Sequence, residues 1–180
     1  MKKFLLILSV LTCIFCIYSV EKTQPIETAE ELKEIKAKDW IRIYFTPGPD
    51  CENNIVAEIK KAKKIDIAVY SITNRKIGDA ILEAHKRGAK VRVITDRLMA
   101  SNQYSLDEEL VAAGIPVVIH KKHKIMHNKY AIFDGKTIVT GSYNWTKAAS
   151  QSNSENCLFF EQPNKEYSTH FIKLWETYTK

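Results

Sequence analysis

Glycine and proline are scarce in this chain of 180 residues, which contains six glycines and five prolines. This scarcity excludes a collagen-like repeat and argues against low-complexity linkers. The chain has only four cysteines, too few for a disulfide-dense small domain. Hydrophobic residues make up 45% and charged residues 27% of the chain, which is typical of an ordinary globular protein and not of a disordered one. The length of 180 residues predicts one domain, or one domain plus a targeting segment, and the sequence shows no internal repeat.

Basic residues outnumber acidic ones, with 27 Lys and Arg against 21 Asp and Glu and a net charge of +6 at pH 7. The sequence pI is near 9.0. A basic domain of this size often binds a polyanion, either nucleic acid or an anionic membrane surface. A solvated basic surface without a partner gives the same composition, so charge alone leaves both interpretations open.

The N-terminus has the layout of a targeting segment, because Lys2 and Lys3 precede an apolar run over residues 4–20. The run is also near the lower length limit for a membrane-spanning helix. We therefore expect residues 1–20 to be a signal peptide or an uncleaved membrane anchor, followed by a linker or short helix over 21–39. Both alternatives predict an exported domain that is periplasmic, membrane-associated or at the cell surface. The anchor would associate it with a membrane through residues 4–20.

Two cysteines, Cys51 and Cys157, remain after this segment. An exported domain meets conditions in which a disulfide can form. The two residues either pair or are small buried side chains, since pairing requires a spatial proximity that sequence does not reveal. Two cysteines do not form a zinc site by themselves.

Hydrophobic spacing predicts alternating strands and helices over residues 40–180. Strands are expected at 40–45, 65–72, 91–95 and 116–120, and helices at 51–63, 76–87, 106–113 and 164–178. Asp50 and Asn74 are expected to cap the first two helices, and Gly88 and Gly114 to end the second and third. This order predicts one α/β domain over 40–180 with a mixed, largely parallel sheet flanked by helices.

Asp134 and Gly135 predict a β-hairpin, because both residues tolerate the positive φ that a two-residue hairpin turn requires. In that register three pairs lie opposite each other: Phe133 with Lys136, Lys129 with Thr140, and His127 with Ser142. One face of the hairpin then carries a polar set: His127, Lys129, Thr140, Ser142 and Asn144. A bulge near the turn would shift this register.

This polar set suits a phosphodiester. The imidazole of His127 can attack phosphorus or protonate the leaving oxygen. The Lys129 ammonium, helped by the Ser142 hydroxyl and the Asn144 amide, can hold the non-bridging oxygens as charge builds up. Taken alone, a His-x-Lys on a strand is more often part of an ordinary exposed sheet face.

The wider pattern, His-x-Lys, four residues, Asp and then Gly-Ser-x-Asn after a strand, resembles the HKD signature of the phospholipase D superfamily. The matching residues are His127, Lys129, Asp134, Gly141, Ser142 and Asn144, with Glu155 in "NSEN" (153–156). The resemblance is closest to the small, single-motif bacterial endonucleases of the superfamily and implies a phospholipase D-like fold. It covers roughly residues 40–178, including "AVYSIT" (68–73), "AHKRGAKVRVITD" (84–96) and "GIPV" (114–117).

In that superfamily two HKD motifs form one active site, so a chain with one motif is implied to act as a homodimer with the site on the two-fold axis. The resemblance further implies that one His127 forms a phosphohistidine while the partner's His127 protonates the leaving oxygen. Glu155 would orient the nucleophilic imidazole. We interpret Asp134 as mainly structural, or as a charge partner across the dimer. The mechanism requires no metal ion or other cofactor.

Three functional classes follow: a metal-independent nuclease acting on DNA, single-stranded DNA included, or on RNA; a phospholipase acting on a lipid such as cardiolipin; and a non-catalytic nucleic-acid-binding module. The first two are enzymes, and the complete motif favours them. Predicted nucleic-acid contacts are the basic residues Lys121, Lys122, Lys124, Arg75 and Lys76. Tyr143 and Trp145 are either stacking surfaces for bases or, more often for such residues, core.

His120, His123 and His127 are close enough in sequence to suggest a zinc site as a competing interpretation. The segment lies between two expected strands, and no Cys or acidic residue within it completes a ligand set. The run "HKKHK" (120–124) is more simply interpreted as a basic patch beside the site.

Overall fold

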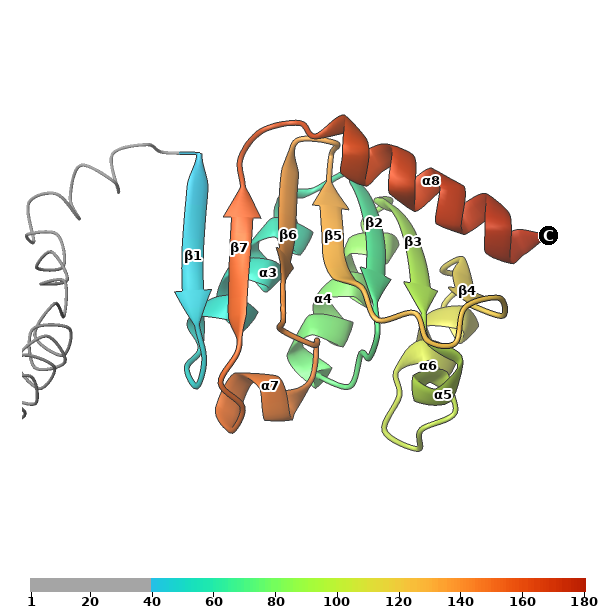
Figure 1. Cartoon of the computed structure of the whole chain (residues 1–180), viewed down its shortest axis with the longest axis horizontal. Helices are drawn as coiled ribbons and strands as arrows, with labels where there is room; N and C mark the ends of the chain where they lie inside the picture. Colours follow the sequence, from blue (N-terminus) through green and yellow to red (C-terminus); the bar gives the residue numbers. More distant parts are fainter. Residues whose placement is uncertain (1–39) are drawn as a thin grey trace, which may run out of the picture. The chain divides into compact units, whose positions relative to one another are not determined.

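The computed structural model describes residues 40–180 (Figure 1). The predicted signal peptide or anchor over 1–20 and the linker over 21–39 lie outside the described residues. In chain order the elements are β1 (Ile41–Phe45), α3 (Asp50–Lys61), β2 (Lys64–Val69), α4 (Arg75–Lys86), β3 (Lys90–Thr95), α5 (Arg97–Ala100), α6 (Asp107–Ala112), β4 (Val117–Ile119), β5 (Lys129–Phe133), β6 (Thr137–Gly141), α7 (Lys147–Gln151), β7 (Asn156–Phe160) and α8 (Lys165–Thr179).

The strands form one seven-stranded mixed sheet in the order β1-β7-β6-β5-β2-β3-β4. Strands β2, β3 and β4 are parallel, because α4 and α6 carry the chain back between them. The other neighbouring pairs are antiparallel, so the expected α/β class is confirmed but parallel pairing is confined to one half of the sheet. A tight turn between β5 and β6, and the short α7 connection to β7, make the other half antiparallel.

Local signals explain where the helices begin and end. Asn74 caps α4 as expected, since its side chain accepts a hydrogen bond from the backbone N–H of Ile77 at 3.2 Å. Gly88 follows α4 with a φ of +94°, and Gly114 follows α6 with a φ of +86°. The expected cap at Asp50 is wrong by one residue. Pro49 occupies the cap position, and Asp50 is already helical and places its charge in the first turn of α3.

Helices cover both faces of the sheet, with α3 and α4 on one face and α8 on the other (Figure 1). The first layer buries apolar residues of α3 and α4 against the inward side chains of β2 and β3. The second layer is smaller, and it packs Phe171 and Leu174 of α8 against Tyr130 and Ile132 of β5. Within residues 40–180, no helix combines the length and apolar character needed to cross a membrane.

The predicted turn forms, but the hairpin contains one more residue than expected. Asp134 and Gly135 have φ values of 54° and 69°, and the Lys136 N–H donates to the Phe133 carbonyl at 2.9 Å. Phe133 then pairs with Thr137, which leaves Lys136 as an extra residue. The expected pairing of Phe133 with Lys136 is therefore wrong.

This extra residue shifts every pair of the hairpin by one position. Thr140 lies opposite Tyr130, so the expected pairing of Lys129 with Thr140 is wrong. Thr140 shares the face of its partner Tyr130, which is the face that α8 covers. Lys129 is adjacent to Tyr130 in the strand and therefore points to the opposite face, which α3 and α4 cover. The polar residues meet at the edge of the sheet and do not form a row along one face.

Asp134 stabilises the fold from the end of the sheet opposite His127. Its carboxylate accepts hydrogen bonds from the backbone N–H groups of Lys63 and Lys64 at 2.9 and 2.8 Å, which fastens the hairpin to the start of β2. The structural interpretation of this motif residue agrees with that position, and the structure does not bring Asp134 to the other motif residues.

We expect Asp134→Ala to lower the free energy of unfolding by about 1–2 kcal/mol, because it removes two hydrogen bonds and a residue that tolerates positive φ. The measurement is urea unfolding of the full chain. Asp134→Asn keeps an acceptor oxygen and the tolerance of positive φ, so it should lose less than half as much. Equal losses in both variants would contradict this account.

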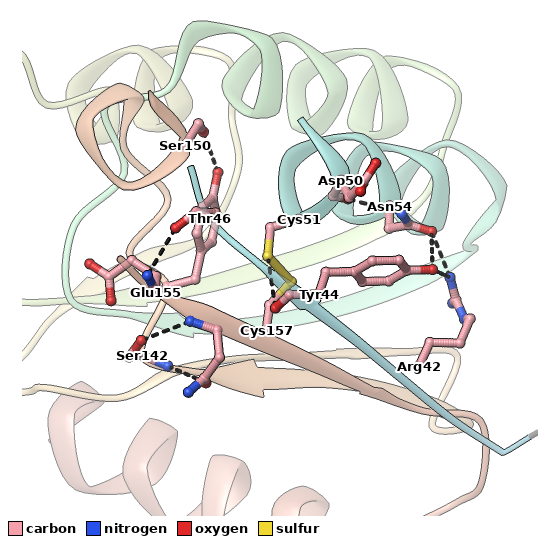
Figure 2. Close-up of a disulfide and its surroundings, with 12 residues drawn as sticks. Arg42, Tyr44, Thr46, Asp50, Cys51, Asn54, Ser142, Ser150, Glu155 and Cys157 are labelled. Atoms are coloured by element: carbon pink, nitrogen blue, oxygen red, sulfur yellow. Dashed lines mark hydrogen bonds between the residues drawn. A yellow bond between two sulfur atoms is a disulfide. The ribbon is translucent and has the colours of Figure 1, made fainter. Parts of the chain in front are cut away.

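Cys51 and Cys157 form a disulfide, which decides between the two alternatives left open by the sequence. Their Cα atoms are 6.0 Å apart, and the bond joins the first turn of α3 to β7 across 106 residues of sequence. Figure 2 shows the bond beside Tyr44 of β1. It therefore links helix α3, near the N-terminal end of the described residues, to the last strand of the sheet.

Candidate active site

The predicted catalytic residues, Asp134 excepted, meet at one edge of the sheet. This edge contains the ends of β2, β3 and β6 and the starts of β5 and β7, and it is the lower edge in Figure 1. The residues there are His127, Lys129, Ser142, Asn144 and Glu155. The carboxyl ends of parallel strands are a frequent place for binding sites in α/β folds.

Tyr70, which directly follows β2, holds His127 and Lys129 in position. The His127 ring meets the Tyr70 ring edge-on with centroids 4.6 Å apart, and the Lys129 ammonium lies 4.9 Å from the centre of the same ring. Lys129 also donates to the His127 carbonyl at 2.9 Å. The Tyr70 N–H donates to the Asn128 carbonyl at 2.8 Å, which holds the backbone between the two residues. Sequence analysis did not assign Tyr70 a role.

Asp96 anchors the irregular segment that leads from β4 to His127. It is fully buried, and one carboxylate oxygen accepts from the Met126 N–H at 2.8 Å while the other accepts from the Leu98 N–H at 2.8 Å. Met126 immediately precedes His127, so this hydrogen bond fixes the backbone from which the imidazole extends into the site. Asp96 closes the segment "VRVITD" at the end of β3, but nothing local in the sequence indicates this distant partner.

The three histidines of the competing zinc interpretation do not converge. The Nδ1 atom of buried His120 accepts from the Arg97 N–H, and its Nε2 atom donates to the His123 carbonyl, both at 3.1 Å. The His123 ring meets the Tyr178 hydroxyl. His127 instead packs on Tyr70, and no group of three or more His, Cys, Asp or Glu side chains in residues 40–180 is arranged to hold a metal ion.

The end of β6 requires glycine for a close approach to β7. Gly141 has a φ of +145°, and a Cβ atom there would collide with the Asn156 carbonyl oxygen. Directly after it, the Ser142 hydroxyl accepts from the Asn156 N–H at 3.1 Å. The Asn156 side chain in turn accepts from the Ser142 N–H at 3.2 Å. Ser142 is exposed and keeps its hydroxyl hydrogen available to a ligand.

Asn144 lies between two core residues. Tyr143 and Trp145 are 2% and 1% exposed, so the stacking alternative for these aromatic rings is wrong and their core alternative holds. The Trp145 N–H bonds to the Ser71 carbonyl just beyond β2, which brings Asn144 to the same edge as His127. Among the described residues, the buried Asn144 Oδ1 atom has no hydrogen-bond partner. This oxygen is therefore a candidate acceptor for a hydrogen bond from a ligand.

Glu155 makes no hydrogen bond to His127 within the described residues of one chain. Its backbone is held by Thr46, whose hydroxyl accepts from the Glu155 N–H at 3.0 Å (Figure 2). Its carboxylate accepts from the Asn153 amide at 2.9 Å. No side chain in the described part of the chain hydrogen-bonds to the His127 ring. The implied orienting contact is therefore missing within one subunit, because β6 separates Glu155 at the start of β7 from His127 at the start of β5.

The electrostatics of the site favour a neutral imidazole beside a cation. Burial lowers the pKa of His127 below its ordinary value of 6.5, the charge of Lys129 lowers it further, and the charge of Asp96 acts in the opposite direction. Burial also lowers the pKa of Lys129, which the Glu155 carboxylate partly opposes. A neutral imidazole is available as a nucleophile, and the adjacent ammonium can stabilise negative charge.

We expect the pKa of His127, measured by NMR titration of its imidazole, to lie below 6.5 and to rise in Lys129→Met. Removing the cation removes the repulsion that disfavours the imidazolium form. Lys136→Met at the opposite edge of the sheet is the matched control and should leave this pKa in place. A lower pKa in Lys129→Met would contradict the charge coupling described here.

The predicted basic contacts fall into two groups. Lys121, Lys122 and Lys124 are exposed on the segment that leads to His127. Arg75 instead pairs with Asp79 and Glu109 at 2.9 and 2.6 Å. Lys76 pairs with Glu52 at 2.8 Å. Acidic partners thus offset the charges of Arg75 and Lys76, and the lysine segment is the stronger candidate for contact with a polyanion.

A groove of about 370 Å³ extends from His127 to α8. Its lining comprises His127, Asn128, Lys129 and Tyr130 at the start of β5, Thr140 and Gly141 at the end of β6, and Glu166, Tyr167 and His170 on α8. Sequence analysis missed the α8 residues. Their spacing puts them on neighbouring turns of one helix, but the approach of that helix to β5 depends on tertiary packing.

The fold and the motif edge define a phospholipase D-like domain. A family model described as "Cardiolipin synthase, PLD-like domain" matches residues 55–175, which is more than half of the chain. The chain therefore belongs to the PLD-like domain family of the phospholipase D superfamily, as the motif resemblance indicated.

The similar proteins include enzymes named after a lipid substrate and a protein of known structure. A mitochondrial cardiolipin hydrolase from Chlamydomonas reinhardtii is 38% identical over 118 residues, covering 64% of this chain and 53% of the relative. A phospholipase D from Rickettsia conorii is 36% identical over 132 residues, covering 73% of this chain and 65% of the relative. The chain thus spans between half and two thirds of the length of these relatives. The crystal structure of Nuc, a phospholipase D family member from Salmonella typhimurium, has a TM-score of 0.72 and 29% identity, covering 76% of this chain and 94% of Nuc.

Proposed function

We propose that this protein is a metal-independent phosphodiesterase that hydrolyses nucleic acid through a phosphohistidine on His127. The observation that carries the proposal is the pairing of an exposed, neutral imidazole with the Lys129 ammonium on the Tyr70 ring. The arrangement supplies a nucleophile and a counter-charge for a phosphate at the same position. Ser142 and Asn144 add hydrogen-bonding groups at the same edge.

The proposed reaction has two displacements at phosphorus. A His127 ring nitrogen attacks phosphorus, the bond to the leaving oxygen breaks, and a second imidazole, in its protonated imidazolium form, donates a proton to that oxygen. The second imidazole then takes a proton from water, whose oxygen attacks phosphorus and breaks the bond to His127. The products are an alcohol and a phosphate monoester, and both imidazoles return to their starting states.

The second imidazole is proposed to come from another copy of this chain. The chain carries one HKD motif, and the two displacements need both a nucleophile and a proton donor. A homodimer whose two-fold axis passes through the site brings two His127 rings to one phosphate. The same pairing would allow Glu155 to meet an imidazole that it does not contact within its own subunit.

Nucleic acid is the preferred substrate because of charge. Three exposed lysines precede His127 in the segment 121–124, and the chain has a net charge of +6. Lysine contacts to backbone phosphates give binding that is salt-dependent and largely independent of sequence. The structural similarity to Nuc extends over 94% of that protein and supports a shared phospholipase D-like catalytic domain.

A phospholipid such as cardiolipin is the alternative substrate. Two relatives above 35% identity are named as a cardiolipin hydrolase and a phospholipase D. The predicted apolar segment over residues 4–20 would place such an enzyme at a membrane. The same imidazole chemistry serves either substrate, so the choice depends on what surrounds the phosphate.

We expect the purified full-length chain to cleave labelled single-stranded DNA, with or without EDTA, because the proposed nucleophile and counter-charge are side chains. Duplex DNA, RNA and cardiolipin vesicles are assayed in parallel, and His127→Ala is the control for contaminating nucleases. Cleavage that disappears in EDTA and returns with a divalent ion would contradict the mechanism. Cleavage of cardiolipin alone would select the lipid alternative.

A further inference from the structure

We propose that the groove between β5, β6 and α8 is a subsite for the nucleobase of a nucleotide bound at the scissile phosphate. This proposal rests on the proposed function and extends it, because it adds Glu166, Tyr167 and His170 of α8 as residues that recognise the substrate. It also states which part of a nucleic acid occupies the space beside His127.

The groove has a different chemical character at each end. At the strand end it is lined by His127 and Lys129, a nucleophile and a cation that suit a phosphate. At the α8 end it contains the Glu166 carboxylate, which would repel a phosphate. A substrate with an anionic centre and a neutral, hydrogen-bonding arm therefore has a single favourable orientation in the groove.

His170 presents a hydrogen-bonding ring nitrogen to this space. Its Nδ1 atom lies 2.9 Å from the Tyr130 hydroxyl. Burial raises the pKa of Tyr130, so this phenol keeps its proton, and its hydroxyl either donates to Nδ1 or accepts from it, according to the imidazole tautomer. Burial, followed by the charges of Lys173 and His123, lowers the pKa of His170. The ring is thus neutral near pH 7 and hydrogen-bonds to Tyr130 through Nδ1, which leaves Nε2 as its second hydrogen-bonding atom.

Tyr167 presents an aromatic ring. It is half-buried, and Tyr130 supports it edge-on with ring centroids 5.1 Å apart. Glu166 and His170, both exposed, lie on adjacent turns of the same helix. The α8 end therefore offers a ring, a carboxylate acceptor and a neutral imidazole together.

A nucleobase matches this combination. Each base has an aromatic face for stacking and an edge with both donors and acceptors. A volume of about 370 Å³ is within the range of small-ligand sites. A lipid acyl chain would bury Glu166 and His170 without hydrogen-bond partners, which is unfavourable. The groove therefore favours a nucleotide over the acyl part of a phospholipid.

The test compares phosphodiesters whose hydrolysis releases p-nitrophenol. The full-length chain is assayed with thymidine 3′- and 5′-(p-nitrophenyl phosphate), with the corresponding deoxyribose esters that lack the base, and with bis(p-nitrophenyl) phosphate. The 3′-esters form one series and the 5′-esters the other. In one of the two series we expect kcat/KM of the wild-type protein to be about tenfold higher for the thymidine ester than for the ester without the base. Tyr167→Leu should reduce this ratio to less than twofold.

Two matched controls separate recognition from folding. Tyr104→Leu changes an exposed tyrosine outside the groove, and Glu176→Ala changes an exposed glutamate farther along α8. Both should keep the tenfold ratio. Glu166→Ala should reduce it, because the carboxylate that accepts from the base is removed. A Tyr167→Leu protein that loses activity equally on base-containing and base-free esters would show a packing role and overturn the proposal.

The failures of the two proposals are distinguishable. Hydrolysis of bis(p-nitrophenyl) phosphate with a base ratio near one in both series overturns the subsite and leaves the phosphodiesterase standing. A glycerol 3-(p-nitrophenyl phosphate) that is hydrolysed faster than both thymidine esters also overturns the subsite, in favour of a lipid head group. If the wild-type protein hydrolyses none of these esters, the proposed function and the subsite both fail.

Discussion

His127→Ala is expected to reduce phosphodiester hydrolysis by about four orders of magnitude or more, while the protein stays folded and binds DNA. The variant removes the nucleophile and, in a homodimer, the proton donor, and losses of this kind are typical when a covalent catalyst is deleted. His127 is exposed, so its truncation leaves no cavity in the core. The measurements are single-turnover cleavage, DNA binding by anisotropy, and thermal unfolding.

Mixing this variant with wild-type protein tests the shared site. A mixed dimer retains one imidazole, which cannot serve as both nucleophile and proton donor. When subunits exchange freely, activity should fall with the square of the wild-type fraction. A linear fall, or full activity in a monomer observed by sedimentation, would show that each chain contains a complete site.

The second large effect concerns stability. Replacing both Cys51 and Cys157 by Ala is expected to lower the free energy of unfolding by about 3–5 kcal/mol, because the bond closes a loop of 106 residues and restricts the unfolded chain. Both residues are buried in the core between α3 and β7, which adds the cost of a small packing defect. The measurement is urea unfolding followed by tryptophan fluorescence.

Reduced wild-type protein is the control for this double variant. If the bond itself provides the stability, unfolding in excess reductant should bring the wild type close to the double variant and leave the double variant unchanged. A difference below about 1 kcal/mol between oxidised wild type and double variant would mean that the disulfide contributes little.

Local chemistry made much of the fold predictable. Asn74 and Gly88 mark the beginning and end of α4 because capping and positive φ depend on residues close in sequence. Asp134 and Gly135 predict the turn for the same reason. The register was not predictable to the residue, because the same turn geometry is compatible with an extra residue at Lys136 and the pairing of Thr137 depends on the rest of the sheet.

The candidate site was predictable only where a motif lies within a short stretch of sequence. His127 and Lys129 are two residues apart and share one local pattern. Tyr70, Asp96 and His170 reach the same region from β2, β3 and α8, and no spacing within the sequence relates them to His127. Glu155 shows the converse case, since the motif includes it but β6 separates it from His127 in one chain, and its orienting role stays a prediction for the homodimer.

The position of β1 at the edge of the sheet has a consequence for synthesis of the protein. Among the described strands, β1 leaves the ribosome first, yet its neighbour is β7, the last strand. Until residues 156–160 emerge, β1 has no partner in the sheet and Cys51 has no cysteine with which to form its native bond. A nascent chain that stops after β6 therefore carries an unpaired β1 and an open edge at β6, which favours association between chains. Completion of the sheet and arrival of Glu155 coincide, so truncated products cannot contain an assembled site.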